Sequence, residues 1–296
     1  MPNVTANGIQ IEYETFGSPT ARPLLLIIGL GQQLIHWDEA LCLDLAHRGH
    51  YVIRFDNRDS GLSSKIEEAG MPDLLEVLGK LFQGEKIQPA YTLDDMADDA
   101  VALLDALGIP KAHLCGMSMG GMIAQTAAIR HPNRVLSLTC VYSTTGSPKV
   151  PQPKPEIMNL LLTPPPKERE NYIEYMLTVF KALTGPAFPL DEKWARQNLA
   201  QSYDRCYYPH GVGRQLIAIL SHGSRTRFLA ELQVPTLVIH GTADPLVPVE
   251  GGEDTARVIP GAQLMLIEGM GHDVPHGGAW PQIVEAISAH TQKIRS

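Results

Sequence analysis

The sequence predicts an α/β fold with a mostly parallel, doubly wound sheet, and two observations carry this prediction. Short, mostly apolar runs recur along the chain, as is typical of strands buried on both faces of a parallel sheet. Segments with apolar residues at helical spacing separate most of these runs, which is the pattern of βαβ units. The predicted strands cover residues 24–28, 51–55, 112–116, 135–141, 236–240 and 262–267. The predicted core helices cover residues 37–49, 92–109, 119–132 and 280–292.

The first predicted element is a β-hairpin at the N-terminus. Asn7 and Gly8 lie between two short alternating runs within residues 4–17. Asn-Gly is the pair that type I′ hairpin turns favour, because both central residues of that turn need a positive φ. We therefore expect the sheet to begin with two antiparallel strands.

A long segment without strand-like runs interrupts the alternation. Within residues 144–232 the only periodic patterns are helical, and they cover residues 171–185, 191–206 and 211–223. The sequence therefore predicts an inserted helical cap over residues 144–232. The remaining residues, 1–143 and 233–296, form the predicted core domain.

Two stretches near this cap lack regular periodicity. Residues 148–166 contain seven of the 23 prolines. Because proline disfavours helix interiors, we expect an extended, semi-rigid connection there rather than a helix. Residues 65–90 are also irregular, and we interpret them as a further flap.

The composition excludes several classes of function. Lys and Arg number 24 and Asp and Glu 32, so the net charge of −8 disfavours a nucleic acid or an anionic membrane as partner. With 296 residues, 44% of them hydrophobic and 19% charged, the chain has enough apolar side chains for a large core. The composition is therefore typical of a folded globular protein.

The cysteines and the N-terminus indicate a location. The cysteines show no C-x-x-C pair and no repeated spacing, so neither a zinc site nor a disulfide framework is indicated; they are Cys42, Cys115, Cys140 and Cys206. The N-terminus lacks the positive and apolar regions of a signal peptide, and no apolar run is long enough to span a bilayer. We expect a cytoplasmic protein with free thiols.

The strongest chemical signal is the run Gly116-Met117-Ser118-Met119-Gly120, which follows a predicted strand and opens a predicted helix. This is the G-x-S-x-G nucleophile elbow in the context that it requires. The serine occupies a strained turn, and a side chain two positions before or after it would collide with its surroundings. We expect Ser118 to be a catalytic nucleophile.

A serine hydroxyl becomes a good nucleophile when a histidine accepts its proton and a carboxylate orients that histidine. Asp244 follows the predicted strand 236–240, and His272 lies in a Gly-rich loop after the predicted strand 262–267. Both loops reach the carboxyl edge of the sheet, where the elbow also lies. His240 and His276 are rival bases, but the first would lie inside the sheet and the second beyond the loop apex. The sequence favours Asp244 and His272.

These features resemble the α/β-hydrolase fold serine esterases, and the resemblance covers most of the chain outside the helical insert. The segment 28–31, with Trp37 beyond it, resembles the family's oxyanion loop, and residues 55–63 resemble its Asp-x-Arg-Gly-x-Gly-x-Ser loop. The resemblance implies an oxyanion hole made of the backbone N–H groups of Leu30 and Met119. Ile28 and Asp59 depart from the family pattern, in which His and Gly are usual.

The runs RFDNRDSGLS and GMSMGGMIAQ are most similar to bacterial esterases near the anthracycline methylesterases. The resemblance implies hydrolysis of a small-molecule carboxylic ester through an acyl-enzyme, without metal or organic cofactor. C–C bond hydrolases, lactonases and cofactor-free perhydrolases share the elbow and remain alternatives. The aromatic residues concentrated in residues 172–208 predict either an aromatic-lined substrate pocket or the core of the cap itself. The oligomeric state is left open.

A dinucleotide-binding fold is a remote alternative. Gly29 and Gly31 follow a strand, and Asp56 ends the next strand at roughly the offset of a ribose-binding acid. Leu34 stands where the third glycine is needed, so a helix could not approach the phosphate closely. A dinucleotide-binding fold also gives no role to Ser118, Asp244 and His272.

Overall fold

A computed structural model describes residues 2–71, 73–276 and 278–294. These residues form one eight-stranded sheet with the order β1-β2-β4-β3-β5-β6-β7-β8. The β1–β2 and β2–β4 pairs are antiparallel, whereas the strands from β4 to β8 along the sheet are paired in parallel. The strands are β1 Asn3–Ala6, β2 Ile9–Phe16, β3 Arg22–Ile27, β4 His50–Phe55, β5 Ala112–Met117, β6 Val135–Val141, β7 Thr236–Gly241 and β8 Gln263–Ile267. The predicted fold class is confirmed.

The N-terminal hairpin forms at the predicted turn. Asn7 has φ 49° and Gly8 has φ 77°, so both central residues adopt the positive φ that a type I′ turn requires. Val4 of β1 pairs with Ile11 of β2, and Tyr13 of β2 then pairs with Phe55 of β4. The hairpin thereby extends the parallel sheet at one edge.

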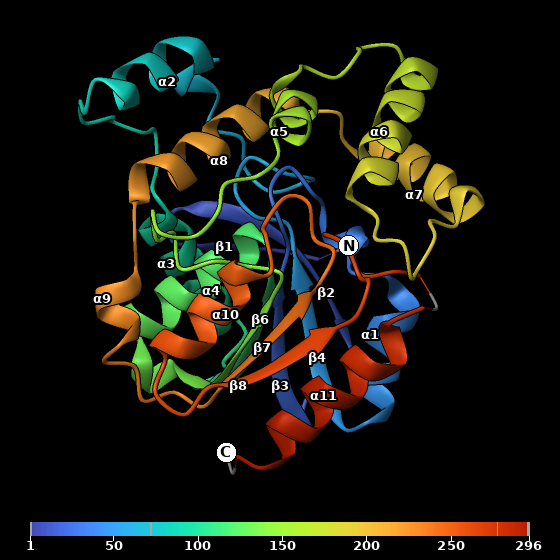
Figure 1. The fold of residues 1–296 in the computed structure, drawn as a ribbon. Coiled ribbons are helices and arrows are strands. Elements are labelled where there is room, and N and C mark those ends of the chain that lie inside the picture. The colour runs from blue at the N-terminus through green and yellow to red at the C-terminus, as the bar shows by residue number, and fades with distance from the viewer. Residues whose placement is uncertain (1, 72, 277, 295–296) are drawn as a thin grey trace.

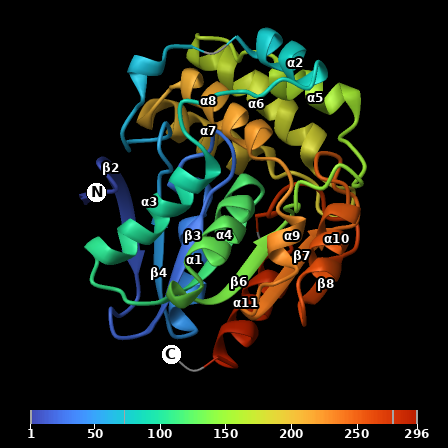
Figure 2. The same cartoon turned by 90° about the vertical axis from the view of Figure 1, so that its left-hand side faces the viewer.

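Helices cover both faces of the sheet, as Figures 1 and 2 show. Leu25 and Ile27 of β3 face the core layer beneath α3 and α4, whereas Leu24 and Leu26 face the layer beneath α1 and α11. An apolar run without alternation is therefore what a strand with two buried faces needs. The covering helices are α1 Glu39–His47, α3 Leu93–Ala106, α4 Met119–Arg130, α10 Glu250–Val258 and α11 Trp280–Gln292.

Further helices follow β6 and precede β7. They are α5 Pro155–Leu162, α6 Arg169–Leu183, α7 Glu192–Arg205, α8 Pro209–His222 and α9 Thr226–Leu229. Helices α5 to α8 lie above the carboxyl ends of the strands, together with α2 (Leu74–Phe82) from the irregular stretch 65–90 (Figure 1). The helix α9 differs: it lies beside the sheet, and Leu229 is buried in the same core layer as α4. Helix α9 therefore packs with the core helices rather than with α5 to α8, and the predicted cap boundaries at residues 144 and 232 stay a prediction.

The expectation of an extended connection over residues 148–166 was partly wrong, because α5 forms within it. Pro155 occupies the first turn of α5, where a fixed φ and a missing N–H group cost nothing. Pro164 to Pro166 follow the end of the helix. The prolines therefore delimit this helix rather than prevent it.

Buried ion pairs join the cap to the loop after β4. The Arg214 Nε and Nη2 atoms of α8 donate to the two carboxylate oxygens of Asp59 at 2.7 and 2.8 Å, and Arg205 of α7 lies 2.7 Å from Asp56. Burial raises the pKa of Asp59, but hydrogen bonds from Arg214 and from the Ile66 N–H group outweigh burial and lower it. Asp59 has φ 65°, the left-handed conformation that suits the glycine usual at this position. Asp59, which departs from the family pattern, therefore binds α8 through Arg214.

Replacing Arg214 with methionine is expected to lower the free energy of unfolding by about 3–5 kcal/mol, because Asp59 would remain buried without its partner. The double variant Asp59→Gly/Arg214→Met is expected to recover much of this loss, since it removes the stranded charge and glycine accepts the backbone conformation. Urea unfolding of both variants measures the effect. A loss below about 1 kcal/mol, or no recovery in the double variant, would contradict this account of the ion pair.

Two further findings concern membranes and thiols. Among the described residues, no helix has both the length and the apolar character needed to cross a membrane. All four cysteines are free thiols, and Cys42, Cys115 and Cys140 are buried.

Candidate active site

The elbow places Ser118 between the end of β5 and the start of α4. Ser118 has φ 53° and ψ −121°, a strained conformation for a residue with a side chain. A Cβ atom at Gly116 would lie 2.1 Å from the Gly120 carbonyl oxygen, and one at Gly120 would lie 2.1 Å from the Ile27 carbonyl oxygen. Both glycines are therefore required by close backbone contacts.

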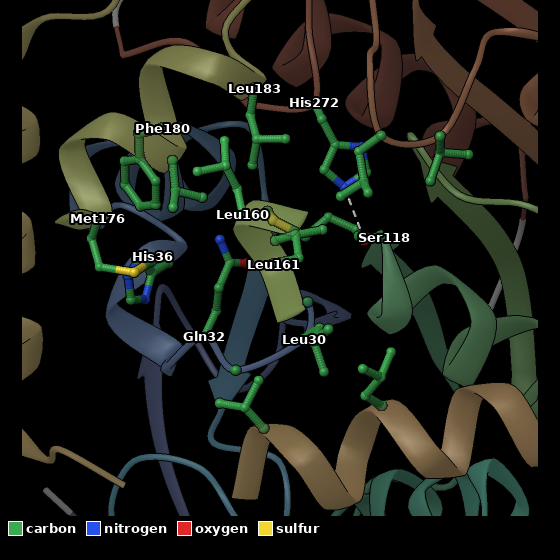
Figure 3. Close-up of a pocket in the computed structure, with 18 of the residues that line it drawn as sticks. Leu30, Gln32, His36, Ser118, Leu160, Leu161, Met176, Phe180, Leu183 and His272 are labelled. Atoms are coloured by element: carbon green, nitrogen blue, oxygen red, sulfur yellow. Dashed lines mark hydrogen bonds between the residues drawn. The ribbon is translucent and has the colours of Figure 1, made fainter. Parts of the chain in front are cut away.

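Ser118, His272 and Asp244 form a continuous chain of hydrogen bonds. His272 Nε2 lies 3.0 Å from Ser118 Oγ, a hydrogen bond drawn as a dashed line in Figure 3, and His272 Nδ1 lies 2.7 Å from Asp244 Oδ2. The other carboxylate oxygen, Asp244 Oδ1, accepts from the Leu246 and Val247 N–H groups at 2.9 and 2.8 Å. The structure thus brings together the three residues that were singled out from the sequence.

The environment of Asp244 keeps it ionised. Burial raises the pKa of Asp244, but the imidazoles of His272 and His240 outweigh burial and lower it to about 2. A carboxylate facing His272 Nδ1 favours the tautomer with a hydrogen on Nδ1. His272 Nε2 is then free to accept the Ser118 proton.

The two rival histidines lie elsewhere. His240 Nε2 donates to the Val247 carbonyl oxygen at 2.8 Å and lies 3.4 Å from Asp244 Oδ2. His240 therefore contacts Asp244 rather than Ser118. The ring of His276 stacks on Trp194 with centroids 4.8 Å apart. Among the described residues, His272 is the histidine hydrogen-bonded to Ser118.

The loop after β3 passes close to the nucleophile. A Cβ atom at Gly29 would lie 3.4 Å from Ser118 Cβ, and Leu30 follows Gly29 and lines the same cavity as Ser118. The backbone N–H groups of Leu30 and Met119 have no hydrogen-bond partner within the described ranges. Met119 also begins α4, where the helix dipole favours negative charge. Gly29, Leu30 and Gly31 line the same cavity as Ser118 and His272.

A cavity of about 800 Å³ lies between this site and the cap. Its wall is largely apolar, and Figure 3 shows side chains from α5 and α6 that point into it, namely Leu160, Leu161, Met176, Phe180 and Leu183. The sequence left two roles open for the aromatic residues of the cap, namely lining a pocket or forming the core of the cap, and some of them do both. Tyr172, Phe180 and Trp194 line the cavity and also pack on the cap's own small core.

Three polar residues of the cavity were not singled out from the sequence: Gln32, His36 and Asp273. Asp273 directly follows His272, and its Oδ1 atom is buried without a partner among the described residues. Burial raises the pKa of Asp273 to about 6, against the smaller opposing effects of His272 and Thr184. The sequence could not predict that these residues line a cavity, because the cavity forms only when the cap packs over the loops that carry them.

Asp273→Asn is expected to stabilise the protein at pH 8 by about 1–3 kcal/mol and to have little effect near pH 4. The folded protein binds the Asp273 proton up to a pH of about 6, whereas an unperturbed carboxyl releases it near 3.8, so wild-type stability falls as pH rises through this window. Thermal unfolding of both proteins at the two pH values measures the effect. An equal difference at both values would refute this role of Asp273.

No cluster of three or more His, Cys, Asp or Glu side chains in the described part of the chain is placed to hold a metal ion. The described cysteines nearest the elbow, Cys115 and Cys140, are buried beneath it rather than in the cavity. Cys206, by contrast, is one of the residues that line the cavity.

Comparison with known proteins places the chain in a family. The model of the alpha/beta hydrolase fold matches residues 22–279. Rhodomycin D methylesterase DauP of Streptomyces sp. (strain C5) is 30% identical over 98% of this chain and 97% of its own length. The corresponding enzyme DnrP of Streptomyces peucetius is 29% identical over 98% and 97% of the two chains.

Solved structures share the same fold. A thermophilic esterase from Thermogutta terrifontis superposes with a TM-score of 0.72 at 23% identity, covering 100% of both chains. A meta-cleavage product hydrolase from Pseudomonas fluorescens IP01 superposes with a TM-score of 0.74 at 20% identity, covering 99% of this chain and 98% of its own. From the family match and the methylesterase relatives, this chain belongs to the alpha/beta hydrolase fold family, as the elbow at Ser118 predicted.

Proposed function

We propose that this protein is a carboxylic ester hydrolase that acts through an acyl-enzyme on Ser118. One observation carries the proposal, namely the hydrogen-bond chain from Ser118 through His272 to Asp244 at the floor of a large apolar cavity. The methylesterase names of the relatives support the same reaction class. The cytoplasmic location remains part of this proposal, and the four free thiols support it.

The geometry suggests the following sequence of steps. His272 Nε2 removes the Ser118 proton while Ser118 Oγ attacks the ester carbonyl, and the N–H groups of Leu30 and Met119 stabilise the oxyanion. His272 then donates the proton to the leaving alkoxide, and the alcohol departs. Water, activated by His272, attacks the acyl-enzyme and releases the carboxylic acid. Asp244 stabilises the imidazolium in both halves of the reaction.

The cavity supports a substrate with a bulky acyl group. A volume of about 800 Å³ greatly exceeds what a short acyl chain fills, and aromatic and aliphatic side chains form most of the wall. The two Streptomyces relatives are named for removal of a methyl ester from rhodomycin D. We therefore propose the methyl ester of a large, flat, largely apolar acid as the preferred substrate class.

The experiment compares methyl acetate, methyl benzoate and methyl anthracenecarboxylates by pH-stat titration. The proposal expects kcat/KM to rise with acyl size by at least about tenfold, because each added ring buries apolar surface in the cavity. A p-nitrophenyl ester series from acetate to decanoate serves as the general esterase control. Absence of turnover with every ester would overturn the proposal, and a vinylogous diketone would then test the C–C hydrolase alternative.

A further inference from the structure

Two polar side chains in the cavity have no role in the reaction described above. Gln32 and His36 lie on the segment that connects the oxyanion loop to α1, and both line the cavity. Figure 3 shows Gln32 and His36 among the side chains of this cavity, together with Leu160, Leu161 and Phe180 from α5 and α6. Both residues therefore line the cavity that, under the proposed function, holds the acyl part of the ester.

The side-chain amide of Gln32 differs from its backbone in its hydrogen bonding. Its backbone is held, because the N–H group donates to Gly29 O at 3.3 Å and the carbonyl oxygen accepts from Ser60 Oγ. Within the described residues, neither side-chain atom of Gln32 forms a hydrogen bond with the protein. The contrast with its neighbour is sharp, since Gln33 Nε2 donates to Ser202 and Cys206 and Gln33 Oε1 accepts from Arg205.

His36 presents a ring nitrogen to the same cavity. His36 Nδ1 lies 3.1 Å from both the N–H group and the carbonyl oxygen of Gln33, so the backbone of Gln33 occupies this ring nitrogen and Nε2 is the one left for other partners. Burial lowers the pKa of His36 to about 4, which keeps the ring neutral near pH 7. In the part of the chain that the structure describes, His36 Nε2 has no hydrogen-bond partner.

An amide and an imidazole nitrogen that lack protein partners among the described residues and face a largely apolar wall are unfavourable unless a ligand or water bonds to them. We propose that Gln32 and His36 form a polar subsite that hydrogen-bonds a ring hydroxyl on the acyl part of the ester. His36 Nε2 and the Gln32 amide bind the hydroxyl together: one of them donates to the hydroxyl oxygen and the other accepts the hydroxyl hydrogen. The subsite rests on the proposed function and narrows its substrate class to hydroxylated aromatic acids.

The test uses matched ligands, namely methyl anthracenecarboxylates that carry one hydroxyl at successive ring positions, together with the unsubstituted parent ester. For wild-type protein the subsite predicts at least one isomer with a kcat/KM about tenfold or more above the parent. Gln32→Met and His36→Phe are each expected to lower this preference to below about threefold. Leu161→Ala, on the same wall, is expected to lower turnover of both esters by a similar factor.

Binding to the Ser118→Ala protein separates the subsite from the reaction. Calorimetry of the same esters is expected to show the tenfold preference in Ser118→Ala and its loss in Ser118→Ala/Gln32→Met. If every isomer binds within about threefold of the parent, or if the preference survives in both subsite variants, the subsite is overturned. Selective binding without turnover in the active protein would instead refute the proposed hydrolysis and leave the subsite standing.

Discussion

Ser118→Ala is expected to lower kcat/KM for ester hydrolysis by about 10⁴-fold or more. The variant removes the only atom that His272 Nε2 is placed to deprotonate, at 3.0 Å, within the described residues. The oxyanion donors and the cavity remain, so a residual rate above that of water is expected. The measurement is the initial rate with a methyl ester and with p-nitrophenyl acetate.

A second serine provides the control for Ser118→Ala. Ser221 lies on α8, donates to the Ala218 carbonyl oxygen and is not itself one of the residues that line the cavity. Ser221→Ala is expected to change kcat/KM by less than about threefold, as surface substitutions generally perturb little. If Ser118→Ala retained more than about a tenth of wild-type turnover, the nucleophile would have to be another residue.

Asp244→Asn is expected to lower kcat/KM by about 10⁴-fold through the histidine tautomer. Asp244 Oδ1 accepts two backbone N–H groups, so the asparagine oxygen is expected to take that position and its NH₂ group to face His272 Nδ1. Nδ1 then becomes an acceptor, and the ring hydrogen moves to Nε2. His272 could no longer accept the Ser118 proton.

The pH profile distinguishes this mechanism from a general loss of structure. Because the pKa of Asp244 is lowered to about 2, wild-type protein carries the carboxylate over the whole range from pH 5 to 9. The Asp244→Asn defect is therefore expected to persist across that range, with the thermal unfolding transition retained. Asp273→Asn, the neighbouring carboxyl variant, is expected to lose far less activity. A defect below about tenfold in Asp244→Asn would assign the acidic role to another residue.

Local patterns were sufficient to predict much of the core and the site residues. The turn at Asn7 and Gly8 needs a positive φ at both positions, and the strand-turn-helix context around Ser118 is continuous in sequence. Asp244 and His272 could be proposed because both follow strands that end at the same sheet edge. These predictions depended on short segments whose geometry is determined nearby.

The features that were missed depend on tertiary packing. Helix α5 was hidden by prolines that turned out to lie at its first turn and beyond its end. Helix α10 begins with Glu250, Gly251 and Gly252, which give no helical apolar stripe, yet Gly252 is needed because a Cβ atom there would lie 2.5 Å from the His240 ring. Gln32, His36 and Asp273 resemble ordinary loop residues until the cap encloses them. Whether a residue is buried by a segment far away in the chain cannot be predicted from the residues next to it in the sequence.

The measurement that tests the central claim most directly is covalent labelling with diethyl p-nitrophenyl phosphate, followed by intact mass and peptide mapping. An activated Ser118 is expected to gain one diethylphosphoryl group with release of p-nitrophenol, and ester hydrolysis is expected to stop in proportion to labelling. Ser118→Ala should remain unlabelled, and His272→Ala should react far more slowly. Full labelling at another residue, or continued ester hydrolysis by protein labelled on Ser118, would contradict the assignment of Ser118 as the nucleophile.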